Sequence, residues 1–220
     1  AEFACAAGGG YGSFLARAAE AMLYWRLPIT RFIDIGTGPG YLLDSAMTFP
    51  IPLAQGAIAN DSLVYQIALE TGRQLKTLGV QMSLCPNALP IRPLTTNDHE
   101  LFGDNPTRIA RRSLLHMKGL QDAGILSCAK YFPLKTIEVI DQKGKSEITF
   151  YHDTLLSNSF RRLFENGLNA VIPDVTDLHL FFETKKADLK KKLTDSSLVL
   201  FESGNLLHQS IGYRGPVMID

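Results

Sequence analysis

The first part of the chain whose residue types suggest a chemical role is the glycine-rich segment Phe32-Ile33-Asp34-Ile35-Gly36-Thr37-Gly38-Pro39-Gly40. It includes a predicted strand, and glycines after a strand let the backbone approach a bound cofactor closely. An acidic residue at the end of the next strand could then hold the ribose of that cofactor, and Asp61 falls near the required spacing. Three glycines near a strand end occur in many turns, so this pattern alone is a weak signal.

With the later segment Asn87-Ala88-Leu89-Pro90, the glycine-rich pattern resembles the S-adenosylmethionine-dependent methyltransferases. That resemblance implies a doubly wound sheet in which residues 34–40 bind the cofactor. The methyltransferase is kept as one alternative for this chain.

A longer series of motifs resembles glycoside hydrolase family 3 in order and spacing. Its central part is Phe102-Gly103-Asp104-Asn105-Pro106, a predicted helix ending near Gly119-Leu120-Gln121, and Lys130-Tyr131-Phe132-Pro133. The family has Arg-Ser-Phe-Gly-Glu-Asp-Pro, Gly-Leu-Gln and Lys-His-Phe-Pro-Gly-His-Gly at these places. Downstream, Ile211-Gly212-Tyr213-Arg214-Gly215-Pro216-Val217-Met218-Ile219-Asp220 is similar to the family segment Leu-Gly-Phe-Lys-Gly-Val-Val-Ser-Asp, which carries the nucleophile. The resemblance covers residues 30–220 and points to the β-N-acetylglucosaminidase branch.

The resemblance implies roles for four residues. Asp220 stands where the family has its carboxylate nucleophile, and Asp34 and Lys130 stand where the family has sugar-binding residues. In a (β/α) barrel such residues gather at the carboxyl ends of the strands. His152 is the one histidine that could replace the proton donor, since a predicted hairpin stands where the family has a histidine-bearing loop.

Other family positions carry replaced side chains. Tyr131 stands for a histidine, Glu100 and Leu42 stand for arginines, and Leu89 stands for an aspartate. A carboxylate or an isobutyl group cannot give the bidentate hydrogen bonds of a guanidinium. We therefore expect a scaffold or residual carbohydrate binder with weak or no hydrolase activity. The alternative is a working retaining β-glycosidase that uses Asp220 as its nucleophile.

The amino-acid composition limits the classes of molecule that this chain is expected to bind. The 22 Lys and Arg residues balance the 22 Asp and Glu residues, which argues against nucleic acid as a partner. Sequence alone predicts no membrane span, no metal site and no cofactor, and it interprets Cys5, Cys85 and Cys128 as buried apolar side chains. The family resemblance implies a glycan or cell-wall substrate in a bacterial setting, periplasmic or exported rather than cytoplasmic.

Short apolar runs alternate with amphipathic stretches, a pattern that is typical of a parallel sheet covered by helices. Strands are expected at residues 31–34, 80–84, 125–129, 170–172 and 217–219, with a remnant at 3–7. Helices are expected at residues 14–25, 62–78, 107–122, 155–166 and 184–193. Asp61 and Asn105 are the predicted N-terminal caps of the second and third helices, and Gly79 and Gly124 are predicted to end them.

These elements predict an α/β fold with residues 1–220 as a single domain, and the family resemblance implies that the fold is of the (β/α)8 TIM-barrel type. An inserted β-hairpin is expected at residues 136–151, where apolar and polar residues alternate. About five or six strands can be counted against the eight that close such a barrel. We therefore expect the barrel to be incomplete, with the missing strands supplied by a continuation of the chain, by another chain or by a rearranged closure.

Overall fold

The structure is a computed structural model. It describes residues 30–41, 43–89, 98–140, 146–152, 157–174, 207–208 and 212–218. For residues 134–140 and 146–152 it describes the backbone. The predicted strand at residues 3–7, the predicted helices at 14–25 and 184–193, and Cys5 all lie outside this part of the chain.

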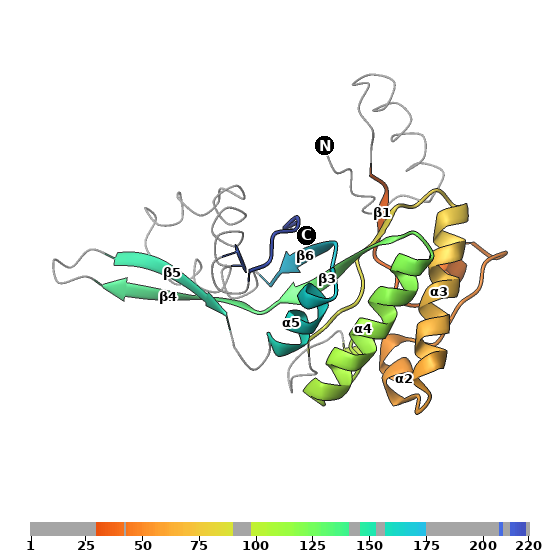
Figure 1. Cartoon of the computed structure of the whole chain (residues 1–220), viewed down its shortest axis with the longest axis horizontal. Helices are drawn as coiled ribbons and strands as arrows, with labels where there is room; N and C mark the ends of the chain where they lie inside the picture. Colours follow the sequence, from red (N-terminus) through yellow and green to blue (C-terminus); the bar gives the residue numbers. More distant parts are fainter. Residues whose placement is uncertain are drawn as a thin grey trace, which may run out of the picture.

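A parallel four-stranded sheet organises the described part of the molecule (Figure 1). Its strands, in sheet order, are β1 (Phe32–Ile33), β2 (Met82–Ser83), β3 (Leu126–Phe132) and β6 (Ala170–Pro173). Phe32 lies opposite Met82, and Met82 lies opposite Leu126, so the first three strands are in step. A fifth segment joins beside β6, where Val217 forms a bridge with Val171. The strands predicted near 31–34, 80–84, 125–129 and 170–172 are thereby confirmed.

The strand order distinguishes the two sheet types considered from the sequence. Each described parallel strand lies beside the next one along the chain, and among these described strands β1 comes first in the order, next to β2. A doubly wound sheet would instead place its first strand in the interior. The sequential order is the one found in a (β/α) barrel. The total number of strands stays a prediction, because parts of the chain lie outside the described residues.

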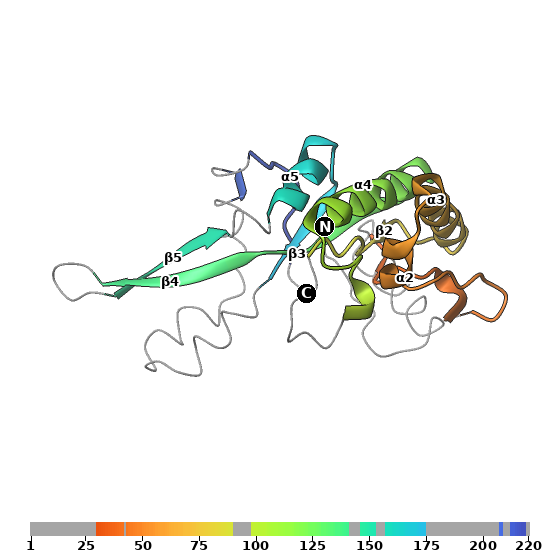
Figure 2. The same cartoon turned by 90° about the horizontal axis from the view of Figure 1, so that it is seen from below.

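Helices cover one face of this sheet (Figures 1 and 2). They are α3 (Asp61–Thr77), α4 (Pro106–Asp122) and α5 (Asn158–Glu165). The short helix α2 (Pro52–Ala57) and the 3-10 turns η1 (Pro39–Tyr41) and η2 (Asp98–Glu100) lie in the connections between strands and helices. The predicted helices at 62–78, 107–122 and 155–166 are confirmed, although α5 is shorter than expected. The short helix α2 was not predicted.

The ends of the two long helices follow from local chemistry. The Asn105 side chain accepts a hydrogen bond from the Arg108 amide at 3.0 Å, as predicted. Gly79 and Gly124 follow the helices with φ of 74° and 85°, a backbone region that favours glycine. The prediction that Asp61 caps α3 was wrong by one residue. The cap is Asn60, which accepts from the Ser62 amide at 3.0 Å.

The predicted hairpin is confirmed. Strands β4 (Leu134–Ile140) and β5 (Ser146–His152) pair in antiparallel fashion, with Leu134 opposite His152. In Figures 1 and 2 the hairpin projects away from the sheet and the helices. It begins directly after β3, so it departs from the edge at which the parallel strands end.

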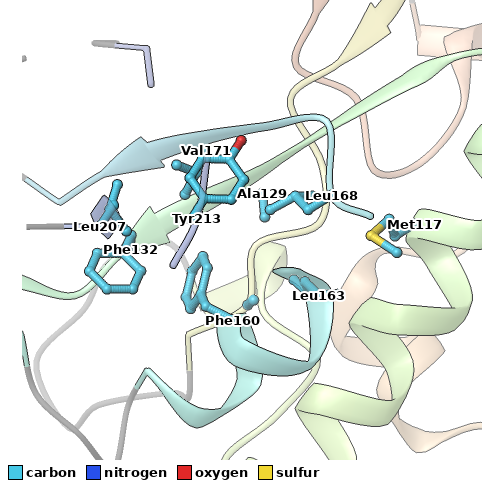
Figure 3. Packing of buried hydrophobic residues seen from close by; sticks show 10 residues of the cluster. Met117, Ala129, Phe132, Phe160, Leu163, Leu168, Val171, Leu207 and Tyr213 are labelled. Carbon is cyan, nitrogen blue, oxygen red and sulfur yellow. The ribbon is translucent and has the colours of Figure 1, made fainter. Parts of the chain in front are cut away.

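Both faces of the parallel sheet carry buried apolar side chains. One cluster joins β3 to α4 and α5, and Figure 3 shows Phe132 and Phe160 in it. The ring centroids of these two residues are 5.3 Å apart, and their planes are at 81°. Cys128, one residue before Ala129 of that cluster, faces the opposite side. There it packs in the inner cluster, whose members are Phe32, Met82, Leu84, Cys128, Ala170, Ile172 and Met218. Burial on both faces is expected when helices cover the outside of a sheet that curves around its own core.

Glycine brings α3 and α4 into close contact. A β-carbon added at Gly119 would lie 2.6 Å from the Tyr65 carbonyl oxygen and 2.7 Å from the Ala68 β-carbon. Gly119→Ala is therefore expected to destabilise the fold by about 1–3 kcal/mol, because overpacking outweighs the better helix propensity of alanine. Urea unfolding followed by circular dichroism measures this.

The exposed neighbour on α4 supplies the matched control for that substitution. Lys118→Ala changes helix propensity little and meets no neighbouring backbone, so its unfolding midpoint should stay close to the original. A Gly119→Ala chain as stable as the Lys118→Ala chain would contradict the close contact.

Candidate functional site

A cavity of about 250 Å³ lies where the first three parallel strands end. Its lining residues are Asp34, Ile35, Gly36, Thr37, Ile51, Pro52, Leu84, Cys85, Asn87, His99, Glu100 and Lys130. Most of them follow β1 or β2 directly or lie in the second half of β3. Functional residues of (β/α) barrels gather at this end of the sheet, so this cavity is the candidate functional site.

Lys130 is the central charged residue of the cavity. Its side chain is 3% exposed, and its ammonium group forms ion pairs with Asp34 and, at 3.3 Å, with Glu100. The Asp34 and Glu100 side chains are 46% and 35% exposed, so they remain open toward the cavity. A buried ammonium persists only when it is paired in this way.

Protonation states in the cavity follow from these contacts. Burial acts to lower the pKa of Lys130, but the charge and hydrogen bond of Asp34, supported by Glu100, raise it above its usual value. Burial also raises the pKa of the Cys85 thiol to about 12. At neutral pH the site therefore offers two carboxylates, one ammonium, a neutral thiol and the imidazole of His99. Carboxylates accept hydrogen bonds from hydroxyl groups and an ammonium donates them, so the arrangement suits a polyhydroxylated ligand.

Backbone hydrogen bonds fix Lys130 against the segment that follows β2. The Lys130 amide donates to the Pro86 carbonyl at 2.9 Å, and the Ala88 amide donates to the Lys130 carbonyl at 2.7 Å. Asn87, between those two partners, forms a parallel bridge with Lys130. From this position the Lys130 side chain reaches Asp34, which follows β1, and Glu100 of η2.

The short helix α2 holds another wall of the cavity. Gln55 donates hydrogen bonds to the carbonyls of Gly36 at 3.0 Å and Pro50 at 2.7 Å, which ties the glycine-rich loop to the helix. Gly56 packs on the backbone of Phe102, whose carbonyl carbon would lie 2.7 Å from an added β-carbon. Phe102 lies two residues after Glu100, so α2 connects the Asp34 side of the cavity to the Glu100 side.

The glycine-rich loop is filled by the chain itself. A β-carbon at Gly38 would lie 2.8 Å from the Met47 carbonyl oxygen and 2.9 Å from a ring carbon of Phe49. The Phe49 amide also donates to the Thr37 carbonyl at 2.6 Å, and the Gly40 amide donates to the Met47 carbonyl at 3.0 Å. These glycines allow the segment at 46–49 to pack closely. The expectation that they let the backbone approach a cofactor is not supported.

Asp61, considered above as a residue that could hold a ribose, instead forms ion pairs within the protein. It stands in the first turn of α3 and forms ion pairs with Arg111 and Arg112 of α4. The Arg112 side chain is 6% exposed, so Asp61 neutralises a buried guanidinium between the two helices. The methyltransferase interpretation therefore loses the support of its glycine-rich loop and of Asp61.

Of the four predicted site residues, the structure brings Asp34 and Lys130 together. Asp220 lies outside the described residues, and His152 is placed by its backbone alone, at the end of β5. Glu100 was interpreted only as a lost arginine, yet it pairs with Lys130. Opposite charge does not single out this pair among the 22 basic and 22 acidic residues of the chain, so the sequence carries no specific signal for it.

Three other residues, Tyr131, Leu89 and Leu42, stand where the family resemblance predicts polar side chains. Tyr131 packs against the inner cluster, and its ring centroid is 5.3 Å from the Lys130 ammonium. Leu89 packs against the cluster between β3 and the helices. Leu42 is outside the described residues. An aromatic ring and an isobutyl group thus add apolar contacts at two places where polar groups were expected from the resemblance.

A larger hollow of about 620 Å³ lies elsewhere. Its lining residues are Arg161, Phe164, Glu165, Leu168, Gly212, Tyr213, Arg214 and Gly215. Leu168 precedes β6 and Gly215 precedes Val217, so this hollow lies near the amino-terminal ends of the strands. Conserved chemistry in barrels lies at the other end. The smaller cavity is therefore the better candidate despite its size.

The described residues contain no cluster of three or more His, Cys, Asp or Glu side chains arranged to hold a metal ion. Cys85 and Cys128 are buried, in agreement with their interpretation as small apolar side chains. In the same part of the chain, no helix combines the length and the apolar character needed to cross a bilayer.

Comparison with known proteins places these observations in a family. Residues 15–220 match the model of the glycosyl hydrolase family 3 N terminal domain. The chain is 29% identical over 205 residues to beta-glucosidase 1 of Saccharomycopsis fibuligera. This match covers 86% of this chain and 21% of that relative. The chain thus spans about a fifth of the length of the curated relatives it matches.

Solved structures show the same fold. A family 3 beta-N-acetylglucosaminidase from Paenibacillus sp. str. FPU-7 is 22% identical, with a TM-score of 0.64 over 96% of this chain and 41% of that one. NagZ from Neisseria gonorrhoeae is 21% identical, with a TM-score of 0.62 over 97% of this chain and 64% of that one. The solved structures agree in fold, and the match of residues 15–220 to the family model shows that the chain belongs to glycosyl hydrolase family 3, in its N-terminal domain.

Proposed function

We propose that this family 3 domain binds carbohydrate in the cavity around Lys130 and hydrolyses glycosides weakly or not at all. The observation that carries the proposal is the convergence of Asp34 and Lys130, which are 96 residues apart in sequence, on one cavity at the carboxyl ends of the strands. Both occupy positions at which the family resemblance implies sugar contacts. The cavity, at about 250 Å³, is below the roughly 300–1,000 Å³ of pockets for larger ligands and suits a single sugar residue.

The proposal of weak hydrolysis rests on what surrounds that pair. Glu100 stands where the family resemblance predicts an arginine, and it uses its charge on Lys130 instead of offering guanidinium hydrogen bonds to a sugar. The hairpin β4–β5 follows β3 where the resemblance predicts a loop with a histidine acid. General acid catalysis supplies roughly 10²- to 10⁴-fold in rate, so the loss of that group alone would leave slow turnover.

The binding half of the proposal is tested by isothermal titration with N-acetylglucosamine and with glucose, because the relatives include both a beta-N-acetylglucosaminidase and a beta-glucosidase. We expect saturable binding of at least one sugar. Asp34→Asn should weaken it by about tenfold or more, since a hydrogen bond to a charged group contributes about 1.5–3 kcal/mol. The matched control is Asp44→Asn, an exposed aspartate that does not line the cavity. Equal losses in the two variants would refute the assignment of Asp34.

The hydrolysis half is tested by nitrophenol release from an aryl N-acetyl-β-glucosaminide and an aryl β-glucoside. Turnover close to the detection limit is expected. The alternative, a working retaining glycosidase with Asp220 as nucleophile, draws support from Val217, which pairs with β6 in the strand that leads toward Asp220. Rapid release that disappears in Asp220→Asn would establish that alternative in place of our proposal.

A further inference from the structure

The candidate site carries an excess of negative charge. Among its described lining residues, Asp34 and Glu100 are the carboxylates and Lys130 is the one lysine or arginine. His99 also lines the cavity, and with its imidazole counted as neutral the two carboxylates and the one ammonium leave a net charge of about −1. The thiol of Cys85 stays neutral, because burial raises its pKa to about 12.

The single cation is already engaged. Lys130 is 3% exposed and pairs with both carboxylates, so little of its charge is presented to a ligand. The carboxylates are far more open, at 46% for Asp34 and 35% for Glu100. A ligand entering this cavity therefore meets acceptor oxygens with negative charge before it meets the ammonium. Low-dielectric walls concentrate such a field within a cleft.

We propose that this cavity selects sugars that carry a free, protonated amino group over neutral, N-acetylated and acidic sugars. The inference rests on the proposed function, because it names the class of carbohydrate that the same site takes. An ammonium group on the sugar donates up to three charge-assisted hydrogen bonds, and Asp34 and Glu100 supply the acceptors. An acetylated nitrogen has no charge and needs more space in a small cavity, and an acidic sugar is repelled.

The test is a titration of the chain with glucosamine, N-acetylglucosamine, glucose and glucuronic acid at neutral pH, where a large part of the sugar amine is protonated. Glucosamine should bind at least about tenfold more tightly than glucose, and glucuronic acid should bind most weakly. The preference for glucosamine should shrink at high salt, since screening weakens partly exposed charge pairs.

Substitutions at Glu100 show whether the charge of its side chain, rather than its size, causes the preference for glucosamine. Glu100→Gln should reduce the ratio of glucosamine to glucose affinity to about twofold, and Glu100→Arg should reverse it in favour of glucuronic acid. Glu165→Gln removes an exposed carboxylate of α5 that does not line this cavity, and the ratio should be the same as in the original chain.

The outcomes distinguish the inference from the function on which it rests. If glucose or N-acetylglucosamine binds and glucosamine binds no more tightly, carbohydrate binding stands and the selection of amino sugars is wrong. If none of the four sugars shows saturable binding, both proposals are overturned. A glucosamine preference that survives Glu100→Gln at full size would also overturn the inference, because its stated cause would be absent.

Discussion

Replacing Lys130 by methionine should lower the free energy of unfolding by about 2–3 kcal/mol at neutral pH. The ammonium lies between Asp34 and Glu100, and methionine of similar length leaves the two carboxylates facing each other without a counter-charge. Loss of one partner from a buried ion pair costs up to 5 kcal/mol. The value here is smaller because both carboxylates are partly exposed and water screens them. Urea unfolding at pH 7 measures the change.

Two comparisons identify the cause of that loss. Adding Asp34→Asn and Glu100→Gln to Lys130→Met removes the uncompensated charges and should restore a large part of the lost stability. Lys118→Met, on the exposed face of α4, should cost less than about 0.5 kcal/mol. If the triple variant is no more stable than Lys130→Met alone, packing rather than charge keeps Lys130 in place.

The same ion pairs fix the sign of the alkaline pH dependence. Because the folded-state pKa of Lys130 lies above its usual value of 10.5, the ion pairs contribute fully below pH 10.5. Their contribution is lost as the pH rises through the folded-state pKa. Lys130→Met should therefore lack this part of the alkaline loss of stability.

Acid should destabilise the fold through His116. This histidine is fully buried in α4, and neither of its ring nitrogens has a hydrogen-bond partner in the part of the chain that the structure describes. Burial lowers the pKa of His116 from 6.5 to about 4. The unfolded chain thus binds a proton more readily than the folded chain between these values, and stability falls as the pH is lowered from 6.5 to 4. The fall contributed by this residue is about 3 kcal/mol.

The contribution of His116 is measured by chemical unfolding at several pH values in that interval. His116→Gln removes the titrating group and should flatten the dependence, whatever its effect on stability at neutral pH. His208→Gln makes the same change at an exposed histidine and should leave the slope as it was. Equal slopes in the two variants would show that His116 does not govern the acid response.

Much of the helical framework could be predicted because its signals are local. Asn105 before Pro106 marks the start of α4, and Gly79 and Gly124 mark the ends of the two long helices. Helix α2 was missed because six residues, with a proline at the start and a glycine inside, are too few to show a 3.6-residue period. The cap of α3 was placed one residue late because Asn60 and Asp61 are both good caps, and sequence does not show which one leaves the helix.

The site was predictable only as far as the family resemblance reached. It indicated Asp34 and Lys130, and the structure brings them into contact. The role of Glu100 could not be read in the same way, because its pairing with Lys130 depends on how η2 folds over the strand ends. Gln55, which ties α2 to the loop at Gly36, was missed because a glutamine without a motif gives no signal in sequence.

The position of α2 has a consequence for the thermodynamics of ligand binding. Gln55 and Gly56 are adjacent in this helix, and they hold the loop at Gly36 and the backbone at Phe102, respectively. Two walls of the cavity are thus braced to each other before any ligand arrives. Binding then requires little ordering of the protein, so the entropic cost of association comes mainly from the ligand.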